Sequence, residues 1–476
     1  MAKASLARLV VLSLLAMMGT IWCPERARAF GPETATTASL RSTAKPSSKP
    51  LSLSQSKKLS TNQNQESLRV LIVGASLAGL STALSLVGKN DRIKVTIVEC
   101  RPDFQSRGAT FSLAPLAQKA LEELAPACVL DKLKKEGLPF VGYDGYMLPW
   151  WRARDCLLEE VRKLPDKIEI HLGVSIDDVV VSDEGGEDRL VAKFKDSDLV
   201  IDADVLVGAD GVNSFVRTNI LKLPPACPTQ AYVWRGSFDT TQKPSLKHFQ
   251  DYPLGSLAEF GNSMLLSYFN FHQRHEGKMA WVFAVRGNAL PSNIAIESGK
   301  TTPKDLLESL LTTTKGDPEL QQKFDTAMLA FENTHQKSDL TWSSEMKVVD
   351  LTTREGWGGK GRITLVGDAA HALRPVTGIG GGLAFEDAAL LGHHLAECTS
   401  AKNIETQLRA FEQRRLPRCR SLSNDQTLRA NLSYEHGFNN LPQWDPKYST
   451  WMDEGFSASP DPPVSEEEVF RELLSK

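Results

Sequence analysis

The chain has 476 residues, more than one small hydrophobic core needs, so we expect one large domain or two interleaved domains. Hydrophobic residues make up 41% and charged residues 24%, which is ordinary for a globular protein, and the formal net charge of -3 gives no support to nucleic-acid binding. The 7 cysteines include no C-x-x-C pair, which favours reduced thiols over a disulfide framework or a zinc site.

The first 66 residues have the composition of a targeting leader. Residues 1–29 join a short basic region to an apolar run, Leu9–Trp22, and end at an A-x-A pattern, as a cleaved signal peptide does. Residues 30–66 are rich in Ser, Thr and Lys, too polar to bury a core, and typical of a transit segment. The junction at Phe30 resembles the signal/transit boundary of proteins imported into secondary plastids. We therefore expect plastid import, with secretion or an endomembrane lumen as the alternative.

A buried strand, a glycine turn and a helix are predicted to open the folded part. Leu68–Val73 is a continuous apolar run, as in a parallel strand covered on both faces. The turn GASLAG follows, then a helical pattern and a second strand that ends at Glu99. An acid about twenty residues after the last glycine has the spacing of a dinucleotide-binding fingerprint. Gly74 would make the tight turn, and Gly79 would let the helix and strand pack closely.

The middle glycine of this fingerprint is replaced by Ser76, which is small and carries a hydroxyl that can donate a hydrogen bond. A glycine-rich turn without a ligand is the alternative reading. No second fingerprint of this kind occurs, so we do not expect a separate nicotinamide-binding domain.

Two further acids follow predicted buried strands. Asp210-Gly211 comes after residues 205–207, and Gly367-Asp368 comes after residues 363–366. Ligand contacts in α/β sheets gather at such C-terminal strand ends, which gives the two acids functional weight.

A glycine-rich loop follows Asp368. It contains Pro375 and four glycines, and the next helix is predicted to begin near Leu383 with Glu386 and Asp387 in its first turn. The loop N–H groups would be free to approach an anion or a polarised ring. An ordinary glycine-rich connection is the alternative.

The pattern changes in the middle of the chain. Residues 232–349 alternate apolar and polar side chains, which predicts an antiparallel sheet with one ligand-facing side, and Pro303–Phe331 is predicted to be mostly helical. The aromatic residues there are candidates for a pocket lining, although core packing is favoured for any one of them. They are Trp234, Phe238, Tyr268, Phe269, Phe271, Trp281 and Phe283.

A helical region is predicted after Leu391 and reaches about Tyr434. We expect its arginines on a solvated or phosphate-facing side. These are Arg414, Arg415, Arg418 and Arg420.

Three segments together resemble the single-component FAD-dependent monooxygenases of the salicylate and urate hydroxylase-like group, which are related to zeaxanthin epoxidase. They are GASLAGL with Glu99, GADGVNSFVR, and GDAAHALRPVTGIGGGLAFEDA, in the order and spacing of the family. The resemblance implies an α/β fold with a Rossmann-like FAD-binding domain (67–225 and 350–435), an inserted, mostly antiparallel substrate-binding sheet (226–349), a C-terminal helical region and a tail (436–476). It also implies reduction by NADH or NADPH and insertion of one oxygen atom through a flavin hydroperoxide.

The resemblance also implies a set of FAD contacts, which are Gly74, Ser76, Ala78, Gly79, Glu99, Ser112, Arg154, Asp210, Gly211, Asp368, Pro375, Gly378, Gly380, Gly381 and Gly382. The first four would lie along the pyrophosphate, mainly through backbone, and Glu99 would bind the ribose. Ser112 and Arg154 match a contact segment and a helix-start arginine of the family, and the Asp210-Gly211 motif is linked to both FAD and nicotinamide. Asp368 would hold the ribityl chain, residues 378–382 would offer N–H groups to the isoalloxazine, and Pro375 would lie near its reactive face.

Two positions depart from the family pattern. The family often has Gln at 379 and Asn at 382, where this chain has Ile379 and Gly382, so only backbone contacts would remain there. His371 falls at a frequent family histidine, and we favour a structural role for it over a catalytic one. We assign no catalytic residue, no general base and no metal ligand.

The function implied by the resemblance is hydroxylation of an aromatic ring or epoxidation of an isoprenoid alkene, with a carotenoid epoxidase as one form of the latter. Expected partners are the small-molecule substrate and molecular oxygen, with no nucleic acid and no transmembrane span in the mature protein. The alternative is a flavin-binding reductase or a redox-responsive binding protein without oxygenase activity.

Overall fold

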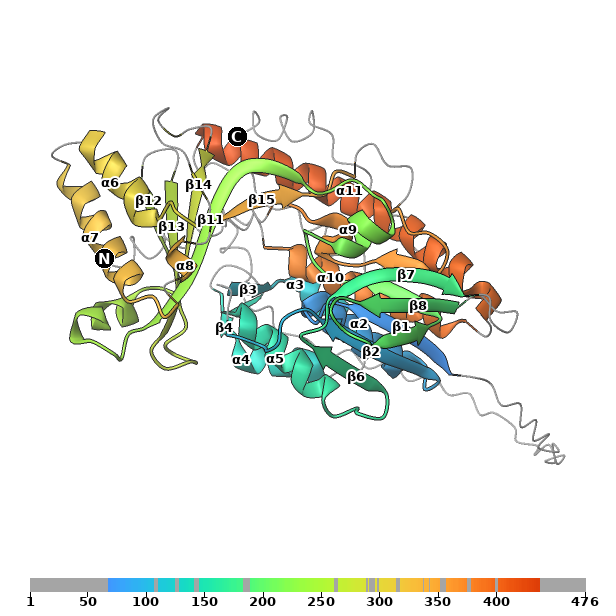
Figure 1. The fold of residues 1–476 in the computed structure, drawn as a ribbon. Coiled ribbons are helices and arrows are strands. Elements are labelled where there is room, and N and C mark those ends of the chain that lie inside the picture. The colour runs from blue at the N-terminus through green and yellow to red at the C-terminus, as the bar shows by residue number, and fades with distance from the viewer. Residues whose placement is uncertain are drawn as a thin grey trace, which may run out of the picture.

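The computed structural model describes residues 67–436, apart from 107–109, 125–127, 141–144, 183–188, 261–263, 288–289, 291–295, 298, 314–316, 337, 342, 352–356, 375–377 and 399–400. The expected leader, Pro375 and the expected tail lie outside the described residues. A parallel and an antiparallel sheet lie side by side, and a long C-terminal helix extends past both of them (Figure 1).

The parallel sheet has five strands in the order β16-β10-β1-β2-β6. The strands are β1 (Leu68–Val73), β2 (Ile93–Glu99), β6 (Ile168–Leu172), β10 (Val205–Gly208) and β16 (Ile363–Leu365). Each predicted acid therefore stands at or just beyond the C-terminal end of a strand in one sheet, although the strands are far apart in the sequence.

Both faces of the parallel sheet are covered, as the apolar run in β1 predicts. Val70 and Ile72 pack on one side against a core that includes α2 (Leu77–Lys89), α5 (Trp150–Val161) and α10 (Gly380–Ala396). Leu71 and Val73 pack on the other side against a small antiparallel sheet. That sheet consists of β7 (Ile176–Ser182), β8 (Arg189–Phe194) and β9 (Val200–Ala203). Alternate side chains of one strand thus serve two cores.

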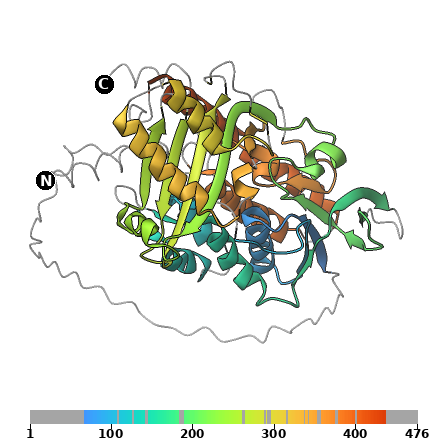
Figure 2. The same cartoon turned by 60° about the vertical axis from the view of Figure 1, so that its left-hand side comes forward.

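The antiparallel sheet has the strand order β12-β13-β14-β11-β15. Its strands are β11 (Cys227–Asp239), β12 (Gly255–Phe260), β13 (Met264–Asn270), β14 (Lys278–Arg286) and β15 (Ser344–Val348). The helices α6 (Pro303–Thr313) and α7 (Pro318–Glu332) cover one of its faces, as Figure 2 shows. The predicted inserted sheet and the predicted helical stretch are both confirmed.

All the aromatic residues named above as pocket candidates are buried in hydrophobic clusters. One group packs beneath α6 and α7 and comprises Trp234, Phe238, Tyr268, Trp281 and Phe283. On the opposite face of the sheet, Phe269 and Phe271 pack against Leu138, Phe140 and Met147. Core packing, the interpretation favoured from the sequence, is confirmed for them.

The remaining elements are short, apart from the last helix. They are β3 (Thr110–Leu113), β4 (Leu138–Pro139), β5 (Tyr146–Pro149), α3 (Pro115–Glu122), α4 (Cys128–Glu136), η2 (Val216–Ile220), η3 (Pro244–Asp251), α8 (Ser338–Thr341), α9 (Asp368–His371), η5 (Ala401–Asn403) and α11 (Ile404–His436). The helical region predicted to reach Tyr434 corresponds to α11. Among the described residues, no helix is both long enough and apolar enough to cross a bilayer.

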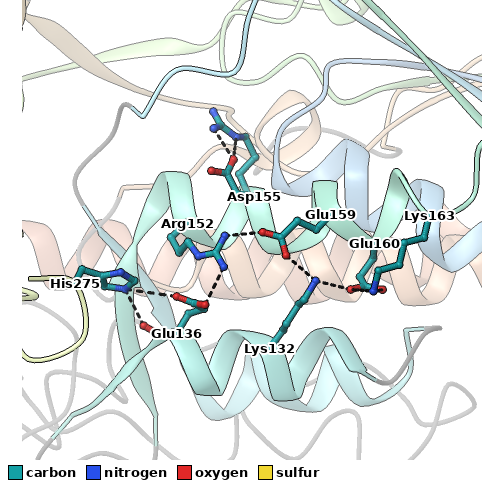
Figure 3. Close-up of polar contacts among 9 residues, drawn as sticks. Lys132, Glu136, Arg152, Asp155, Glu159, Glu160, Lys163 and His275 are labelled. Atoms are coloured by element: carbon teal, nitrogen blue, oxygen red, sulfur yellow. Dashed lines mark hydrogen bonds and ion pairs between the residues drawn. The ribbon is translucent and has the colours of Figure 1, made fainter.

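A network of ion pairs joins α4 to α5 (Figure 3). Arg152 on α5 binds Glu136 on α4 at 2.8 Å, and it binds Glu159, two turns further along the same face of α5, at 2.7 Å. His275, from the turn between β13 and β14, places its Nε2 3.0 Å from the Glu136 carbonyl oxygen. The network therefore connects α4 and α5 to a turn of the antiparallel sheet.

Two predictions about charged residues in the C-terminal half are wrong. The helix α10 begins at Gly380 and not near Leu383, so Glu386 and Asp387 lie in its second turn, fully buried. Arg415 and Arg418 are not solvated but fully buried against those two acids. The error arose because a charged face of one helix was read without the matching acids on the helix it packs against.

Candidate functional site

The turn between β1 and α2 requires both of its glycines. Gly74 has a φ of +108°, and a Cβ there would overlap the Ala209 carbonyl. A Cβ on Gly79 would overlap the Gly74 carbonyl oxygen. The tight turn and the close helix–strand contact expected from the sequence are therefore present.

The N-terminus of α2 is left open at this turn. Ser76 is the N-cap residue but makes no side-chain cap bond. The first N–H groups of any α-helix lack an intrahelical partner, so those of residues 77–79 are available to an acceptor. Glu99 lies alongside, since its Oε2 accepts from the Ala75 N–H at 3.0 Å and its Oε1 from the Arg101 N–H at 3.1 Å.

The Asp210 side chain is hydrogen-bonded to the segment that follows it in the chain. Its carboxylate accepts hydrogen bonds from Ser214 Oγ at 2.5 Å and from the N–H groups of Phe215 at 2.7 Å and Val216 at 3.1 Å. Burial raises the pKa of Asp210, and these bonds oppose the rise. Asp210 thus caps η2, a role that the sequence did not indicate, while the adjoining Gly211, with a φ of +79°, has open space on its Cβ side.

Arg217 connects this segment to the Gly367-Asp368 turn. The side chain is fully buried, and it donates to the Val212 carbonyl at 2.5 Å and the Ala369 carbonyl at 2.8 Å. The two acid-bearing segments that follow β10 and β16 are therefore fixed to each other.

Gly367-Asp368 packs directly on the start of α2. Gly367 has a φ of +58°, and a Cβ there would lie 2.8 Å from the Cβ of Ala78. Asp368 keeps an exposed side chain, yet desolvation by the surrounding protein raises its pKa. A carboxylate that lines an internal recess would show both properties. We call this site the Asp368 recess.

The glycines of the loop before α10 lie on the same recess. A Cβ on Gly378 would stand 3.2 Å from the Cβ of Ser112, and a Cβ on Gly380 would stand 4.0 Å from Asp368 Oδ1. No side chain caps the start of α10, so its first N–H groups are also available. Ser112 is thus brought together with Asp368 and the glycine loop, which lie more than 250 residues later in the chain.

The next two glycines serve packing. A Cβ on Gly381 would overlap the Phe111 ring, and one on Gly382 would lie 3.3 Å from Ala117 at the start of α3. A larger residue at position 382 would displace α3, which explains physically why this chain has glycine where the family often has Asn.

Arg235 on β11 is a site residue that the sequence analysis missed. Its side chain is exposed, but burial of its surroundings lowers its pKa, and the nearby Asp368 carboxylate opposes that change. Arg235 is therefore close enough to the Asp368 carboxylate to interact with it, and we assign it to the Asp368 recess. Strand alternation was the signal, because Trp234 faces the α6–α7 core and its neighbour must face the other way.

The side chains beside Arg235 on this face are small or apolar. The paired strands form the row Arg235, Val282, Ser267 and Leu257 across β11, β14, β13 and β12. Val282 and Leu257 are partly accessible, whereas Ser267 is buried. The sheet thus offers the recess an apolar surface with a cation at one end.

Arg154 is neither solvated nor free. Its side chain is 4% exposed, pairs with Asp155 at 2.6 Å and donates to the Gln105 carbonyl at 2.9 Å. The guanidinium also stacks 5.2 Å from the centre of the Phe104 ring. An open hollow of about 410 Å³ lies next to it, but none of the expected FAD contacts lines that hollow. Arg154 is therefore buried and anchors the segment after β2.

A buried polar cluster lies behind the recess. Ligand-type atoms of His371, Asp387 and Cys419 lie within 4.8 Å of one another, a grouping that the sequence did not reveal. Asp387 nevertheless already accepts from the Gly367 N–H and from Arg415, both at 2.7 Å. A cation bound there would meet the Arg415 guanidinium, so we read the cluster as an ion-pair network.

The residues around the recess fit FAD. Two uncapped helix N-termini, those of α2 and α10, suit the pyrophosphate and the polar edge of the ring system. Asp368 can accept from ribityl hydroxyls, Glu99 can accept from ribose hydroxyls, and the Cβ side of Gly380 is open. Pro375 lies outside the described residues, so its expected position remains a prediction.

Comparison with known proteins agrees with this assignment. Residues 311–425 match the family model described as an FAD binding domain. Salicylate hydroxylase of Pseudomonas putida is 26% identical over 389 residues, which cover 75% of this chain and 84% of that protein. Hispidin-3-hydroxylase of Neonothopanus nambi is 26% identical over 386 residues, 74% of this chain and 86% of that protein.

The fold agrees as well. The crystal structure of CtdE in complex with FAD superposes with a TM-score of 0.62 at 17% identity, over 82% of this chain and 99% of the other. The fold class expected from the sequence, an α/β FAD-binding domain with an inserted antiparallel sheet and C-terminal helices, is confirmed. The chain is similar to the salicylate hydroxylase-like monooxygenases over about three quarters of its length; it is an FAD-dependent monooxygenase, and FAD is its cofactor.

Proposed function

We propose that this enzyme uses NADH or NADPH to reduce FAD and inserts one atom of molecular oxygen into an aromatic ring. The observation that carries the proposal is Arg235, a cation that interacts with Asp368 and ends a row of small or apolar side chains on the sheet. Phenolic and carboxylated aromatics combine a flat apolar body with one anionic group, which suits such a surface.

The residues of this chain would bind and orient the reactants and exclude solvent from them. When bound, FAD supplies the activation of oxygen, and the protein supplies position and electrostatics. Val282 and Leu257 would exclude water from the substrate face. The N–H groups at the start of α10 and the Arg235 guanidinium would stabilise negative charge near them.

Two features favour an aromatic substrate over an isoprenoid alkene. An isoprenoid hydrocarbon offers no anionic group to Arg235, so only the nearby Asp368 carboxylate would offset the desolvation of the guanidinium. The relatives named above are described as acting on salicylate and hispidin. Epoxidation of an isoprenoid alkene stays the second substrate class, because the apolar row would accept such a chain.

The test uses the purified full-length chain with FAD, NADH or NADPH, and isotopically labelled oxygen. Candidate substrates are salicylate, 3-hydroxybenzoate and a carotenoid. We expect an aromatic compound to stimulate oxidation of the reduced nicotinamide and to gain one labelled oxygen atom by mass spectrometry. Labelled product from the carotenoid alone would move the enzyme to the isoprenoid class. Oxidation of the reduced nicotinamide without labelled product from any of these candidate substrates would favour the non-oxygenase alternative.

We also propose that residues 1–66 direct the enzyme to a plastid. Their composition supports the proposal, namely a signal-like run followed by a segment poor in acids. Fusing these residues to a fluorescent protein in an alga with secondary plastids tests it. Plastid fluorescence is the expected result, and fluorescence confined to the medium or the endomembrane system would contradict it.

A further inference from the structure

His371 lies outside the expected FAD contacts, yet it is tied to the turn that carries Asp368. The helix α9 is a single turn, with Asp368 at its start and His371 at its end. One oxygen of Asp387, on α10, joins both ends of this turn. Its Oδ2 accepts from the Gly367 N–H at 2.7 Å and lies 2.6 Å from His371 Nε2. Loss of either contact would therefore disturb the turn.

The surroundings of His371 favour the cationic form of its imidazole. Burial alone would lower the pKa of His371, but the Asp387 carboxylate and the neighbouring Cys419 raise that pKa well above its usual value. Arg415 fixes the other oxygen of Asp387, Oδ1, at 2.7 Å. The carboxylate is thus held between two positive groups, which keeps it ionised and its hydrogen bonds strong.

The imidazole of His371 is a further basic group beside two buried acids and two buried arginines. Arg415 and Arg418 together balance Glu386 and Asp387, since all four side chains are fully buried and paired at 2.5 to 2.9 Å. The His371 imidazole thus shares the Asp387 carboxylate with Arg415, and Cys419 also favours its positive charge. The nearest carboxylate along the chain is three residues earlier, on the same helical turn.

Asp368 responds to that charge. Burial raises the pKa of Asp368, and His371 leads the influences that oppose this rise, followed by Arg235 on β11 and Arg217 on η2. Asp387 on α10 acts in the opposite direction. Removing the charge at position 371 would leave Asp368 easier to protonate, and a protonated carboxyl loses part of its capacity to accept hydrogen bonds.

We propose that His371 is a positioning residue for FAD: its positive charge, fixed by Asp387, keeps the Asp368 carboxylate ionised and the Gly367 turn in place for the ribityl hydroxyls. The proposal rests on the assignment of Asp368 to the cofactor. The sequence analysis expected only a structural role for this histidine, and the proposal adds that its side chain must be positively charged. The need for that charge can be detected in the pH dependence of FAD binding.

The experiment measures the affinity of the full-length apoprotein for FAD between pH 4.5 and 9 by quenching of flavin fluorescence. His371→Asn should bind FAD roughly 10-fold more weakly at pH 7, and its loss of affinity on acidification should begin at a higher pH than in the wild type. His371→Lys keeps a positive charge and should retain the wild-type acid limb. His394→Asn is the matched control, because His394 lies in the last turn of α10 and pairs with Gln407 away from the recess.

The outcomes distinguish a failure of the role proposed for His371 from a failure of the assignment of Asp368 to FAD. Uniformly weaker binding by His371→Asn with an unmoved acid limb would mean a packing role alone and would overturn the proposal. Asp368→Asn should abolish the acid limb; if it leaves FAD affinity unchanged at every pH, the assignment of Asp368 fails instead. Should His371→Asn not fold, the lysine variant decides: a wild-type acid limb supports the proposal, and a shifted limb overturns it.

Discussion

Replacing Arg415 by Met tests how much the buried cluster contributes to stability. The fully buried side chain donates to Asp387 at 2.7 Å, to Glu386 at 2.5 Å and to the Leu383 carbonyl at 3.3 Å. Breaking a buried ion pair by removing one partner costs about 3–5 kcal/mol, because a charge is left without compensation. Glu386 keeps Arg418, and Asp387 keeps His371, so we expect a loss near 3 kcal/mol in the free energy of unfolding.

Arg152→Met is a matched control for this substitution. Arg152 also bridges two carboxylates, at 2.7 and 2.8 Å, but its side chain is 21% exposed. Each partly exposed pair is expected to contribute about 0–1 kcal/mol. Urea unfolding of the apoprotein at neutral pH, followed by tryptophan fluorescence, measures both variants. A loss below about 1 kcal/mol for Arg415→Met, or equal losses for the two variants, would refute the reasoning.

Three further predictions concern the recess and its supports. Asp368→Ala should weaken FAD binding by roughly 10- to 100-fold, seen as pale protein after purification, because a charge-assisted acceptor is lost; unchanged yellow protein would refute its role. Arg235→Met should raise KM for an anionic aromatic much more than for its neutral amide analogue, and equal changes would argue against an anion contact. The apoprotein should lose stability as pH rises from 6 to 9, since the raised pKa of His371 stabilises the fold below its unfolded pKa and that contribution is lost as pH passes the folded one; His371→Asn should show a flatter urea-midpoint profile.

The parallel sheet and its glycine turn were predictable from the sequence because their causes are local. The run at β1 is apolar except for Arg69, and the glycines at 74 and 79 stand where a Cβ would overlap backbone. Strand, turn and acid therefore specify the same arrangement, and no distant contact was needed to read it.

The buried ion pairs could not be read in the same way. Arg415 and Arg418 have ordinary helical spacing, and nothing nearby in the sequence marks them as buried. Their partners, Glu386 and Asp387, lie about thirty residues earlier on α10, and the pairing depends on how α10 and α11 pack. Tertiary packing overrode the usual preference of arginine for the surface.

Arg235 occupies an intermediate position. The alternation along β11 could have placed it on the face opposite Trp234, but only the structure shows that this face meets the Asp368 turn. Asp210 shows the opposite case. Its motif predicted a ligand contact, whereas its carboxylate is hydrogen-bonded to the start of η2. A motif locates a segment, and the hydrogen bonds of its side chain decide what that side chain does.

The central claim is that one recess, bounded by Asp368, the loop before α10 and the β11 face, holds FAD with its substrate. A crystal structure of the full-length protein with FAD tests it most directly. We expect the ribityl chain against the Asp368 carboxylate, the ring system beside the N-terminus of α10, and Arg235 on the opposite side of the ring. FAD bound elsewhere, or bound with Asp368 turned away from it, would contradict the claim.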